Sequence, residues 1–298
     1  MRFIFISDTH FTRTREMENP VWLNRMIINE WDEIKGVFIS EIKNLKPDAI
    51  IHCGDITHFG TKEDFLFGKE VLDATGIDWY AVPGNHDSYT EEIKNEMQEM
   101  FGVTDKDGFC YSKVFGRIAI AFFDVCKRRR GKHFFVGDSE LIWLENFMEE
   151  NCDKIIFLVC HIPVRHKNVI ANHGTLNCGD EVASGKVFGH YFDKMIGKIE
   201  NVKELRNLIS LNSNVKAVFS GHWHINSLYS KNNVYYKTVP SVCEYPCEVV
   251  IADCSTDRIR LYNKTLELIN IQDKSIVPEW NNTWVKGAKK TRDTMIFI

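Results

Sequence analysis

Short runs of consecutive apolar residues recur along the first 220 positions of the chain, separated by longer amphipathic stretches. Each run has the length of a strand, and unbroken apolarity is typical of a strand that is buried on both faces. Strands in alternation with helices predict βαβ units and a largely parallel sheet. The predicted strands are 2–7, 49–52, 79–82, 118–123, 155–160 and 215–220.

The amphipathic stretches predict helices at 21–45, 62–74, 89–101, 139–150 and 202–211. The first of them carries its apolar side chains on one helical stripe. Thr61 and Ser88 precede the second and third, and in both cases an acidic residue follows three positions later, which is the pattern of a capping box. Gly102 is expected to end the third helix, because glycine readily takes the left-handed backbone found there.

Beyond residue 230 the pattern changes, and strand-like runs at 234–239, 249–253 and 258–262 follow one another without helical stretches between them. This succession predicts a second, more antiparallel sheet. We therefore expect one domain over residues 1–264 and a C-terminal extension over residues 265–298. The extension ends in MIFI, a run that is expected to dock as a strand.

The composition, 44% hydrophobic and 26% charged, is that of a globular protein. A formal net charge of −4 argues against a general nucleic-acid or anionic-membrane partner. The chain begins MRFIFISDTH, where Asp8 comes too early for a signal peptide, and no apolar run is long enough for a membrane span. We expect a cytoplasmic protein. Its nine scattered cysteines, such as Cys53 and Cys160 within apolar runs, predict reduced core thiols.

Polar residues suited to metal binding follow five of the predicted strands. In open α/β sheets the carboxyl ends of the strands gather at one edge, so residues distant in sequence can converge there. The set comprises Asp8, His10, Asp55, Asn85, His161, His222 and His224. Asp8 and His10 are two positions apart, as are His222 and His224, and in extended backbone such pairs point to the same side. Glycine precedes three of the clusters and permits close backbone approach.

Two carboxylates, one amide and four imidazoles are too many ligands for one tetrahedral zinc ion. They suit two divalent ions that share a bridging carboxylate. Nitrogen and oxygen ligands without cysteine are compatible with Mn, Fe, Zn, Co or Ni. Taken singly, a histidine at a strand end is more often structural, and Asp55 has the alternative role of capping the next segment. The coincidence of five segments favours the metal site.

The five segments stand in the order of the motifs of the calcineurin-like metallophosphoesterase family, which this chain resembles over residues 8–224. The motifs are Asp8-x-His10, Gly54-Asp55, Gly84-Asn85-His86-Asp87, His161 and Gly221-His222-x-His224. The resemblance implies an α/β fold: a four-layer α/β/β/α sandwich with two mixed β-sheets, as in metallo-dependent phosphatases. It also implies a dinuclear metal site.

The resemblance further implies how the residues divide between the two ions. One ion would be held by Asp8, His10, Asp55 and His224. The other would be held by Asp55, Asn85, His161 and His222, so that Asp55 bridges. His86 would be the family's catalytic histidine rather than a ligand.

The activity implied is hydrolysis of small phosphodiesters, such as cyclic nucleotides, by attack of a metal-bound hydroxide. The expected cofactors are two divalent ions, Mn, Fe or Zn. With two carboxylates and the hydroxide, the site carries a charge of about +1 and attracts an anionic ester. A protonated His86 stabilises the developing charge or protonates the leaving group.

Several alternatives remain open at this point. Within the family they are a phosphomonoesterase, a nucleotide pyrophosphatase and a nuclease, and the acidic charge balance counts against the nuclease. The alternative outside the enzymes is a non-catalytic binding scaffold. The intact ligand set and His86 argue against the scaffold. The oligomeric state is not decided by the sequence.

Weaker features lie around the five motifs. Asp87 either orients the turn behind the ligands or caps the third predicted helix. The basic stretch 127–133 is expected to be a solvated hairpin or loop, with a contact to substrate phosphate as the alternative. The long segment 163–188 is expected to shape the pocket. His52 and His58 are expected to have only local structural roles.

Overall fold

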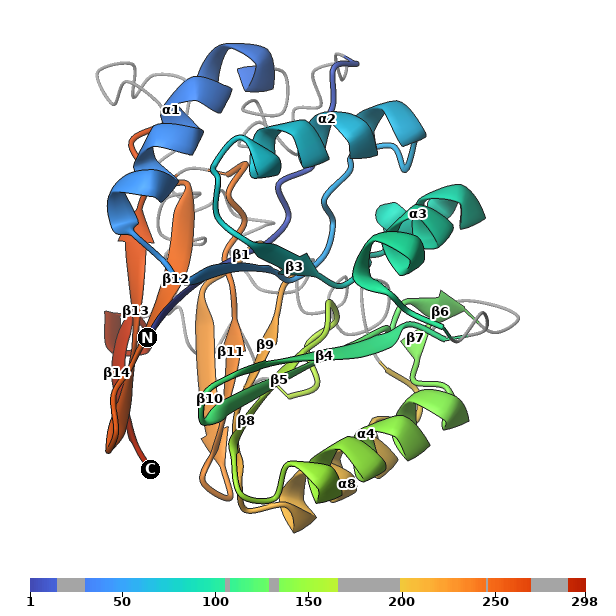
Figure 1. Ribbon diagram of the computed structural model, residues 1–298, viewed down its shortest axis with the longest axis vertical. Helices are drawn as coiled ribbons and strands as arrows, with labels where there is room; N and C mark the ends of the chain where they lie inside the picture. Colours follow the sequence, from blue (N-terminus) through green and yellow to red (C-terminus); the bar gives the residue numbers. More distant parts are fainter. Residues whose placement is uncertain (15–29, 105–107, 129–133, 166–198, 245, 269–288) are drawn as a thin grey trace, which may run out of the picture.

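The protein folds as a four-layer sandwich. The computed structural model describes residues 1–14, 30–104, 108–128, 134–165, 199–244, 246–268 and 289–298. Two six-stranded sheets form the inner layers. Figure 1 shows helices along the upper side of the sandwich, α1 (Trp31–Leu45), α2 (Lys62–Asp73) and α3 (Glu91–Phe101), and along the lower side, α4 (Asp138–Glu150) and α8 (Val202–Leu211). This arrangement confirms the expected α/β/β/α fold class.

The first sheet has the strand order β14-β13-β12-β1-β2-β3. Its parallel half is β1 (Arg2–Ile6), β2 (Ala49–His52) and β3 (Trp79–Ala81). Its antiparallel half is β12 (Glu248–Cys254), β13 (Arg258–Thr265) and β14 (Asp293–Phe297). The expected docking of the terminal MIFI run as a strand is confirmed, because β14 pairs with β13. The domain boundary expected at 264 falls at the end of β13 and stays a prediction.

The second sheet has the order β10-β11-β9-β8-β5-β4. Its central strands run parallel and are β5 (Ile118–Phe123), β8 (Ile155–Val159), β9 (Val215–Ser220) and β11 (Val234–Thr238). Antiparallel strands close both edges, β4 (Cys110–Phe115) and β10 (Ser227–Lys231). A small ribbon of β6 (Lys127–Arg128) and β7 (Phe134–Phe135) stands apart.

The expectation of one parallel sheet followed by a separate antiparallel sheet was wrong. The six apolar runs divide between the two sheets, three to each, and the late strands join both. β11 extends the second sheet in parallel with β9, whereas β12 pairs antiparallel with β1. An apolar run shows that a strand is buried on both faces, but every buried strand of a sandwich has that pattern whichever sheet it joins.

β5 illustrates why these runs are unbroken. Ile118, Ile120 and Phe122 pack into the core between the sheets, and the alternate residues pack into the layer beneath α4 and α8. Successive side chains of a strand point to opposite faces, and here both faces are covered. Most of the cysteines in the described part of the chain are buried, including Cys53 and Cys160, as expected for core residues. Among the described helices, none combines the length and apolarity needed to cross a bilayer.

The predicted helix starts differ in their outcome. The Thr61 side chain accepts a hydrogen bond from the Asp64 backbone N–H and caps α2, as predicted. Ser88 instead donates its hydroxyl to the Gly84 carbonyl and lies in a 3-10 turn, η2 (Asp87–Tyr89), so α3 begins later than predicted. Gly102 ends α3 with a φ of 71°. Of the first predicted helix, residues 21–29 lie outside the described residues.

Candidate metal centre

The five candidate segments follow β1, β2, β3, β8 and β9 and meet where these strands end. The segments after β1 and β2 run side by side, since Asp8 N–H donates to the Gly54 carbonyl at 3.0 Å and His10 N–H donates to the Asp55 carbonyl at 3.1 Å. The two sheets are joined by His222, whose N–H donates to the Asp8 carboxylate at 3.0 and 3.1 Å. The structure therefore brings both sheets to one cluster.

The predicted ligands fall into two overlapping groups. In each group the potential ligand atoms all lie within 4.8 Å of one another. The first group is Asp8, His10, Asp55 and His224, and the second is Asp55, His161 and His222. Asn85 joins the second, because its Oδ1 lies 3.2 Å from His161 Nε2. Asp55 is common to both. All seven predicted ligands are thus brought together, and their role as ligands stays a prediction.

The backbone is left-handed rather than extended at five of the seven predicted ligands. Positive φ values occur at Asp8 (51°), His10 (47°), Asp55 (55°), His222 (69°) and His224 (56°). The expectation that each i, i+2 pair converges through extended backbone was therefore wrong. The strands end before these residues, and tight turns direct the side chains. Aspartate and histidine are among the few non-glycine residues that are enriched in this conformation.

Two glycines are required by close packing at the centre. A Cβ atom at Gly84 would lie 2.1 Å from Asp55 Oδ1, and one at Gly221 would lie 2.6 Å from Asp8 Oδ2. Neither distance is possible for a side chain, so the backbone itself packs against each carboxylate. The Gly84 turn also lets His86 N–H donate to Asp55 Oδ1 at 2.8 Å.

The orientation of two imidazoles follows from the atoms behind them. His161 Nδ1 lies 2.8 Å from the Cys53 carbonyl oxygen, and His224 Nδ1 lies 2.5 Å from Glu244 Oε1. Both oxygens act as acceptors, so each Nδ1 must carry the proton and donate it. In the neutral ring, Nε2 then carries the lone pair. This is the arrangement of a metal-binding histidine held by a hydrogen bond from its other nitrogen.

The Nε2 atoms of these rings point at other electron-rich atoms. His161 Nε2 lies 3.3 Å from Asp55 Oδ2 and 3.2 Å from Asn85 Oδ1. His224 Nε2 lies 3.2 Å from both Asp8 Oδ1 and His10 Nε2. Imidazole nitrogens, carboxylates and an amide oxygen converging in this way fit a divalent cation that accepts nitrogen and oxygen ligands.

The electrostatics of the cluster favour positive charge. Burial alone would raise the pKa of Asp55, but His161 and His86 hold that pKa well below its usual value. Burial alone would also raise the pKa of Asp8, but His224 and His161 lower it below its usual value. Burial disfavours the charged form of His161, yet Asp55 raises its pKa to about 9. The site keeps its carboxylates ionised and attracts either a proton or a metal cation.

His86 lies at the border of the cluster and is half-buried. Its Nδ1 is 2.6 Å from the His58 carbonyl oxygen and therefore donates to it. Its ring meets the His10 ring edge to face, with the centroids 4.5 Å apart. The ring thus stands beside the first ligand group in a fixed orientation, and His86 belongs to neither of the two groups that contain Asp55.

Asp87 lies beneath the same turn and is fully buried. Its carboxylate accepts hydrogen bonds from the backbone N–H groups of Gly84 at 2.8 Å, Ile56 at 3.1 Å and Thr57 at 2.8 Å. Burial and the nearby Asp55 raise its pKa, and the three N–H groups oppose that rise. Its bonds join the turn after β3 to the turn after β2. This geometry favours the orienting role over capping of α3.

Two residues with contacts to this centre were missed in the sequence. Glu244 holds His224, and nothing in its local sequence marks it, because it follows β11 and reaches the centre only through the fold. His58 was expected to have only a local role, but its ring Nδ1 lies 3.4 Å from His10 Nδ1 and its carbonyl holds His86. Its position three residues after Asp55 was the available signal. The expectation for His52 fits the structure: burial lowers its pKa to about 3, and its Nε2 lies 2.9 Å from Thr9 Oγ1.

Two predicted features lie largely outside the described residues. Residues 129–133 of the basic stretch and 166–188 of the long segment belong there, so their roles stay predictions. The described part of the basic stretch, β6, pairs antiparallel with β7, which fits the expected hairpin.

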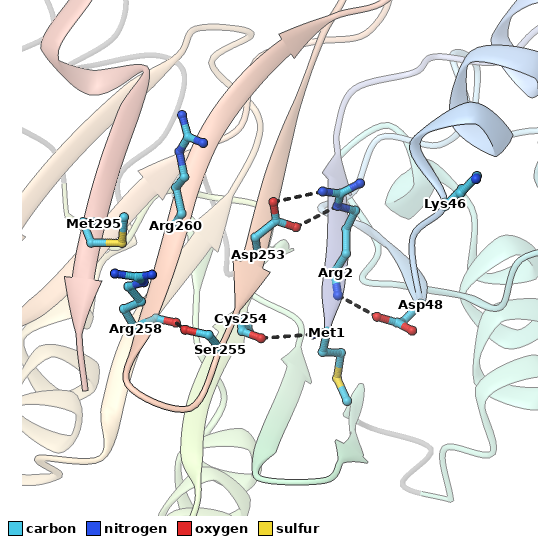
Figure 2. Close-up of a pocket in the computed structure, with 10 residues that line it drawn as sticks. All are labelled: Met1, Arg2, Lys46, Asp48, Asp253, Cys254, Ser255, Arg258, Arg260 and Met295. Atoms are coloured by element: carbon cyan, nitrogen blue, oxygen red, sulfur yellow. Dashed lines mark hydrogen bonds and ion pairs between the residues drawn. The ribbon is translucent and has the colours of Figure 1, made fainter.

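A cavity of about 590 Å³ lies at the other end of β1, away from these residues. Figure 2 shows its lining, in which Arg2 at the start of β1 forms an ion pair with Asp253 of β12. Arg260, also in the lining, is paired with Asp293. The lining also includes Lys46 and Arg258, and it contains none of the predicted site residues.

Comparison with known proteins relates the chain to phosphoesterases. A family model described as calcineurin-like phosphoesterase matches residues 1–226. A probable glycerophosphodiester phosphodiesterase GpdQ of Arcobacter nitrofigilis is 29% identical over 167 residues, which cover 55% of this chain and 57% of that protein. A probable cyclic nucleotide phosphodiesterase of Ruthia magnifica is 23% identical over 243 residues, covering 80% of this chain and 85% of that protein.

The first of these relatives is therefore matched over little more than half of its length. Among solved structures, a dimetal phosphatase from Danio rerio superposes with a TM-score of 0.69. The superposition covers 99% of this chain and 98% of that one, at 13% sequence identity. At this identity the likeness concerns the fold.

Proposed function

The chain belongs to the calcineurin-like phosphoesterase family, and from this membership we propose that it is a two-metal phosphohydrolase acting on small phosphodiesters. One observation carries the proposal: two groups of candidate ligands share Asp55, with their nitrogen and oxygen atoms turned toward one another. The relatives named as glycerophosphodiester and cyclic nucleotide phosphodiesterases support a diester substrate.

Seven side chains would hold the two ions. Asp8, His10 and His224 would hold one, Asn85, His161 and His222 would hold the other, and Asp55 would belong to both sets. When bound, two divalent ions (Mn, Fe or Zn) would supply a nucleophile from water at neutral pH and would stabilise charge on the attacking and leaving oxygens. With both ions bound, the two ionised carboxylates would leave the centre with a small positive charge, which would attract a diester monoanion.

The protein residues around the ions fix the geometry of the reaction. Cys53 and Glu244 hold the rings of His161 and His224, so that each presents Nε2. Asp87 fixes the two turns that carry Asp55 and Asn85 relative to each other. Preorganised ligands of this kind need no rearrangement when charge develops in the transition state.

His86 is the proposed proton donor to the leaving oxygen. Its Nδ1 is committed to the His58 carbonyl, so Nε2 is the ring nitrogen that acts on substrate. A protonated imidazole at this position stabilises negative charge on the ester and passes its proton to the departing alkoxide.

The test is metal analysis of the purified protein, followed by hydrolysis assays with added Mn. Nitrophenyl monoesters and diesters, cyclic nucleotides, a glycerophosphodiester and a DNA oligomer form the panel. We expect two ions per chain and a higher kcat/KM for small diesters than for monoesters or DNA. Preference for monoesters would make the protein a phosphatase. A strong DNA preference with a steep salt dependence would make it a nuclease.

A further inference from the structure

Phe59 is a large aromatic side chain left partly exposed in a segment that carries a candidate ligand. It is 40% exposed, and it follows Asp55 by four residues. Among the described side chains of the five ligand-bearing segments, the other large apolar ones are buried, including Phe11, Ile162 and Trp223. An isolated exposed apolar residue is ordinary on a protein surface, so its position must decide its meaning.

Phe59 lies one ring away from His86. Its ring meets the His58 ring edge to face, with the centroids 4.4 Å apart. His58 in turn stacks on His86, with the centroids 5.5 Å apart and the planes inclined at 23°. His58 is only 4% exposed, whereas Phe59 reaches solvent. The buried His58 ring therefore lies between the half-buried His86 ring and the partly exposed Phe59 ring.

The backbone around Phe59 is held on both sides. Phe59 N–H donates to Asp64 Oδ2 at 3.1 Å, at the start of α2. The next carbonyl, that of Gly60, accepts from Thr90 Oγ1 at 2.9 Å. The exposed ring therefore stands on a fixed loop between the turn that carries Asp55 and the turn that carries His86. A fixed aromatic ring offers contact area at little cost in conformational entropy.

We propose that Phe59 contacts the organic group of the ester, and that the site favours diesters bearing a flat aromatic group over those bearing only small polar alcohols. This inference rests on the proposed function. If His86 acts on the leaving oxygen, an organic group attached near that oxygen lies on the His86 side of the centre, where Phe59 is exposed. A nucleobase or an aryl ring has a flat face that stacks on phenylalanine, and glycerol has none.

The experiment compares Phe59→Ala and Phe59→Leu with the wild-type protein on three diesters: a cyclic nucleotide, a nitrophenyl diester and a glycerophosphodiester. For the cyclic nucleotide and the nitrophenyl diester we expect Phe59→Ala to raise KM about tenfold, the effect of losing one stacked ring. For the same two substrates, the KM of Phe59→Leu should lie between those of the wild-type protein and Phe59→Ala. The KM for the glycerophosphodiester should be unchanged in both variants. Phe297→Ala, which alters another exposed phenylalanine on β14, is the matched control and should change no KM.

A binding measurement separates contact from chemistry. Calorimetry on the metal-loaded protein should show weaker binding of a nucleoside monophosphate to Phe59→Ala, with unchanged binding of inorganic phosphate. Circular dichroism and metal content identify any variant that has lost its fold. Phe59→Leu retains apolar volume and keeps the test valid if Phe59→Ala does not fold.

The outcomes distinguish this inference from the function on which it rests. If the wild-type protein hydrolyses no phosphoester, the proposed function fails. If it hydrolyses all three diesters but the Phe59 variants change every KM by the same factor, or change none, the aromatic contact is overturned. An effect on the cyclic nucleotide alone would assign the contact to a nucleobase, and an effect on both aromatic substrates would assign it to flat groups in general.

Discussion

The two ends of β1 present opposite arrangements of charge. At its start, Arg2 donates two hydrogen bonds to the Asp253 carboxylate at 2.7 and 3.1 Å, and both side chains are about one-third exposed. Just beyond its other end, Asp8 is fully buried and faces the Nε2 atom of His224. One end pairs opposite charges in contact with water. The other gathers electron-rich groups out of water.

This difference shows that the chemistry of the side chains, rather than the presence of a cavity, identifies the candidate site. A cavity lies at the Arg2 end, but the exposed ion pair of Arg2 with Asp253 contributes little to stability and needs no bound ion. Buried carboxylates and imidazoles are costly unless charge of the opposite sign joins them. We therefore expect the chemistry at the end of β1 where the carboxylates and imidazoles are buried. Four changes would break or sharpen this comparison.

Asp55→Ala should have the largest effect, because Asp55 belongs to both ligand groups. We expect the loss of both ions and of all measurable hydrolysis, with the fold retained. Elemental analysis and circular dichroism are the measurements, and Asp55→Asn serves as the control of similar shape. Two ions retained at wild-type occupancy would exclude a bridging role.

His86→Ala should come next, because it removes a group that acts on substrate and leaves the ligands in place. We expect most of the metal to remain and turnover to fall by about 10²–10⁴-fold, the usual range for a proton-transfer group. The loss should shrink for nitrophenyl esters, whose leaving groups need no proton. An equal loss for good and poor leaving groups would instead indicate charge stabilisation alone.

Glu244→Ala should have an intermediate effect that is visible in metal binding. Without the acceptor for His224 Nδ1, we expect affinity for one ion to fall by about 10–100-fold, the scale reported for such supporting residues. Glu244→Gln keeps an oxygen acceptor and should lose less. Titration calorimetry of the metal-depleted protein measures both variants. Unchanged affinity in Glu244→Ala would show that His224 is positioned by other contacts.

Asp253→Asn should have the smallest effect, because it alters only the exposed pair at the opposite end of β1. Its hydrogen bond with Arg2 lowers the pKa of Asp253, so the pair stabilises the fold above the ordinary carboxylate pKa and loses that contribution as the pH falls through the lowered value. We expect a loss below about 1 kcal/mol at neutral pH and no change in kcat/KM.

Urea unfolding at pH 7 and at acid pH, together with the phosphodiester assay, tests this expectation for Asp253→Asn. The difference in stability between the variant and the wild-type protein should shrink at acid pH. A large fall in activity would show that the two ends of β1 are coupled, which would contradict the view that they act independently.

The sequence was most informative where chemistry is local. Asn85 and His161 stand at the carboxyl ends of apolar runs, so their gathering could be predicted from the rule that such strand ends collect ligand-binding residues, although the strands belong to two sheets. The sheets that β11 and β12 join could not be predicted, because a strand buried on both faces has the same pattern in either sheet. Glu244 was missed for a related reason: its contact with His224 exists only once β11 has been placed beside β9.

His58 and the ligand backbone show a second limit. The pairing of His58 with His10 depends on two loops running side by side, which no periodicity reports. The spacing of His222 and His224 predicted convergence correctly, but for the wrong backbone. Turns with positive φ and extended strands can both direct i and i+2 side chains to one centre, so spacing alone does not distinguish them.

The left-handed turns have a consequence for anyone who would transplant this centre into another protein. The residues that metal ions accept and the residues that tolerate positive φ overlap at aspartate, asparagine and histidine, so the five ligand positions with positive φ meet two requirements at once. Glutamate offers the same carboxylate as Asp8, yet it meets the coordination requirement without sharing that backbone preference. A design that places only the ligand residues on straight strands would lack the turns that direct their side chains toward one centre. To transfer the centre, each strand end must be transferred together with the turn that follows it.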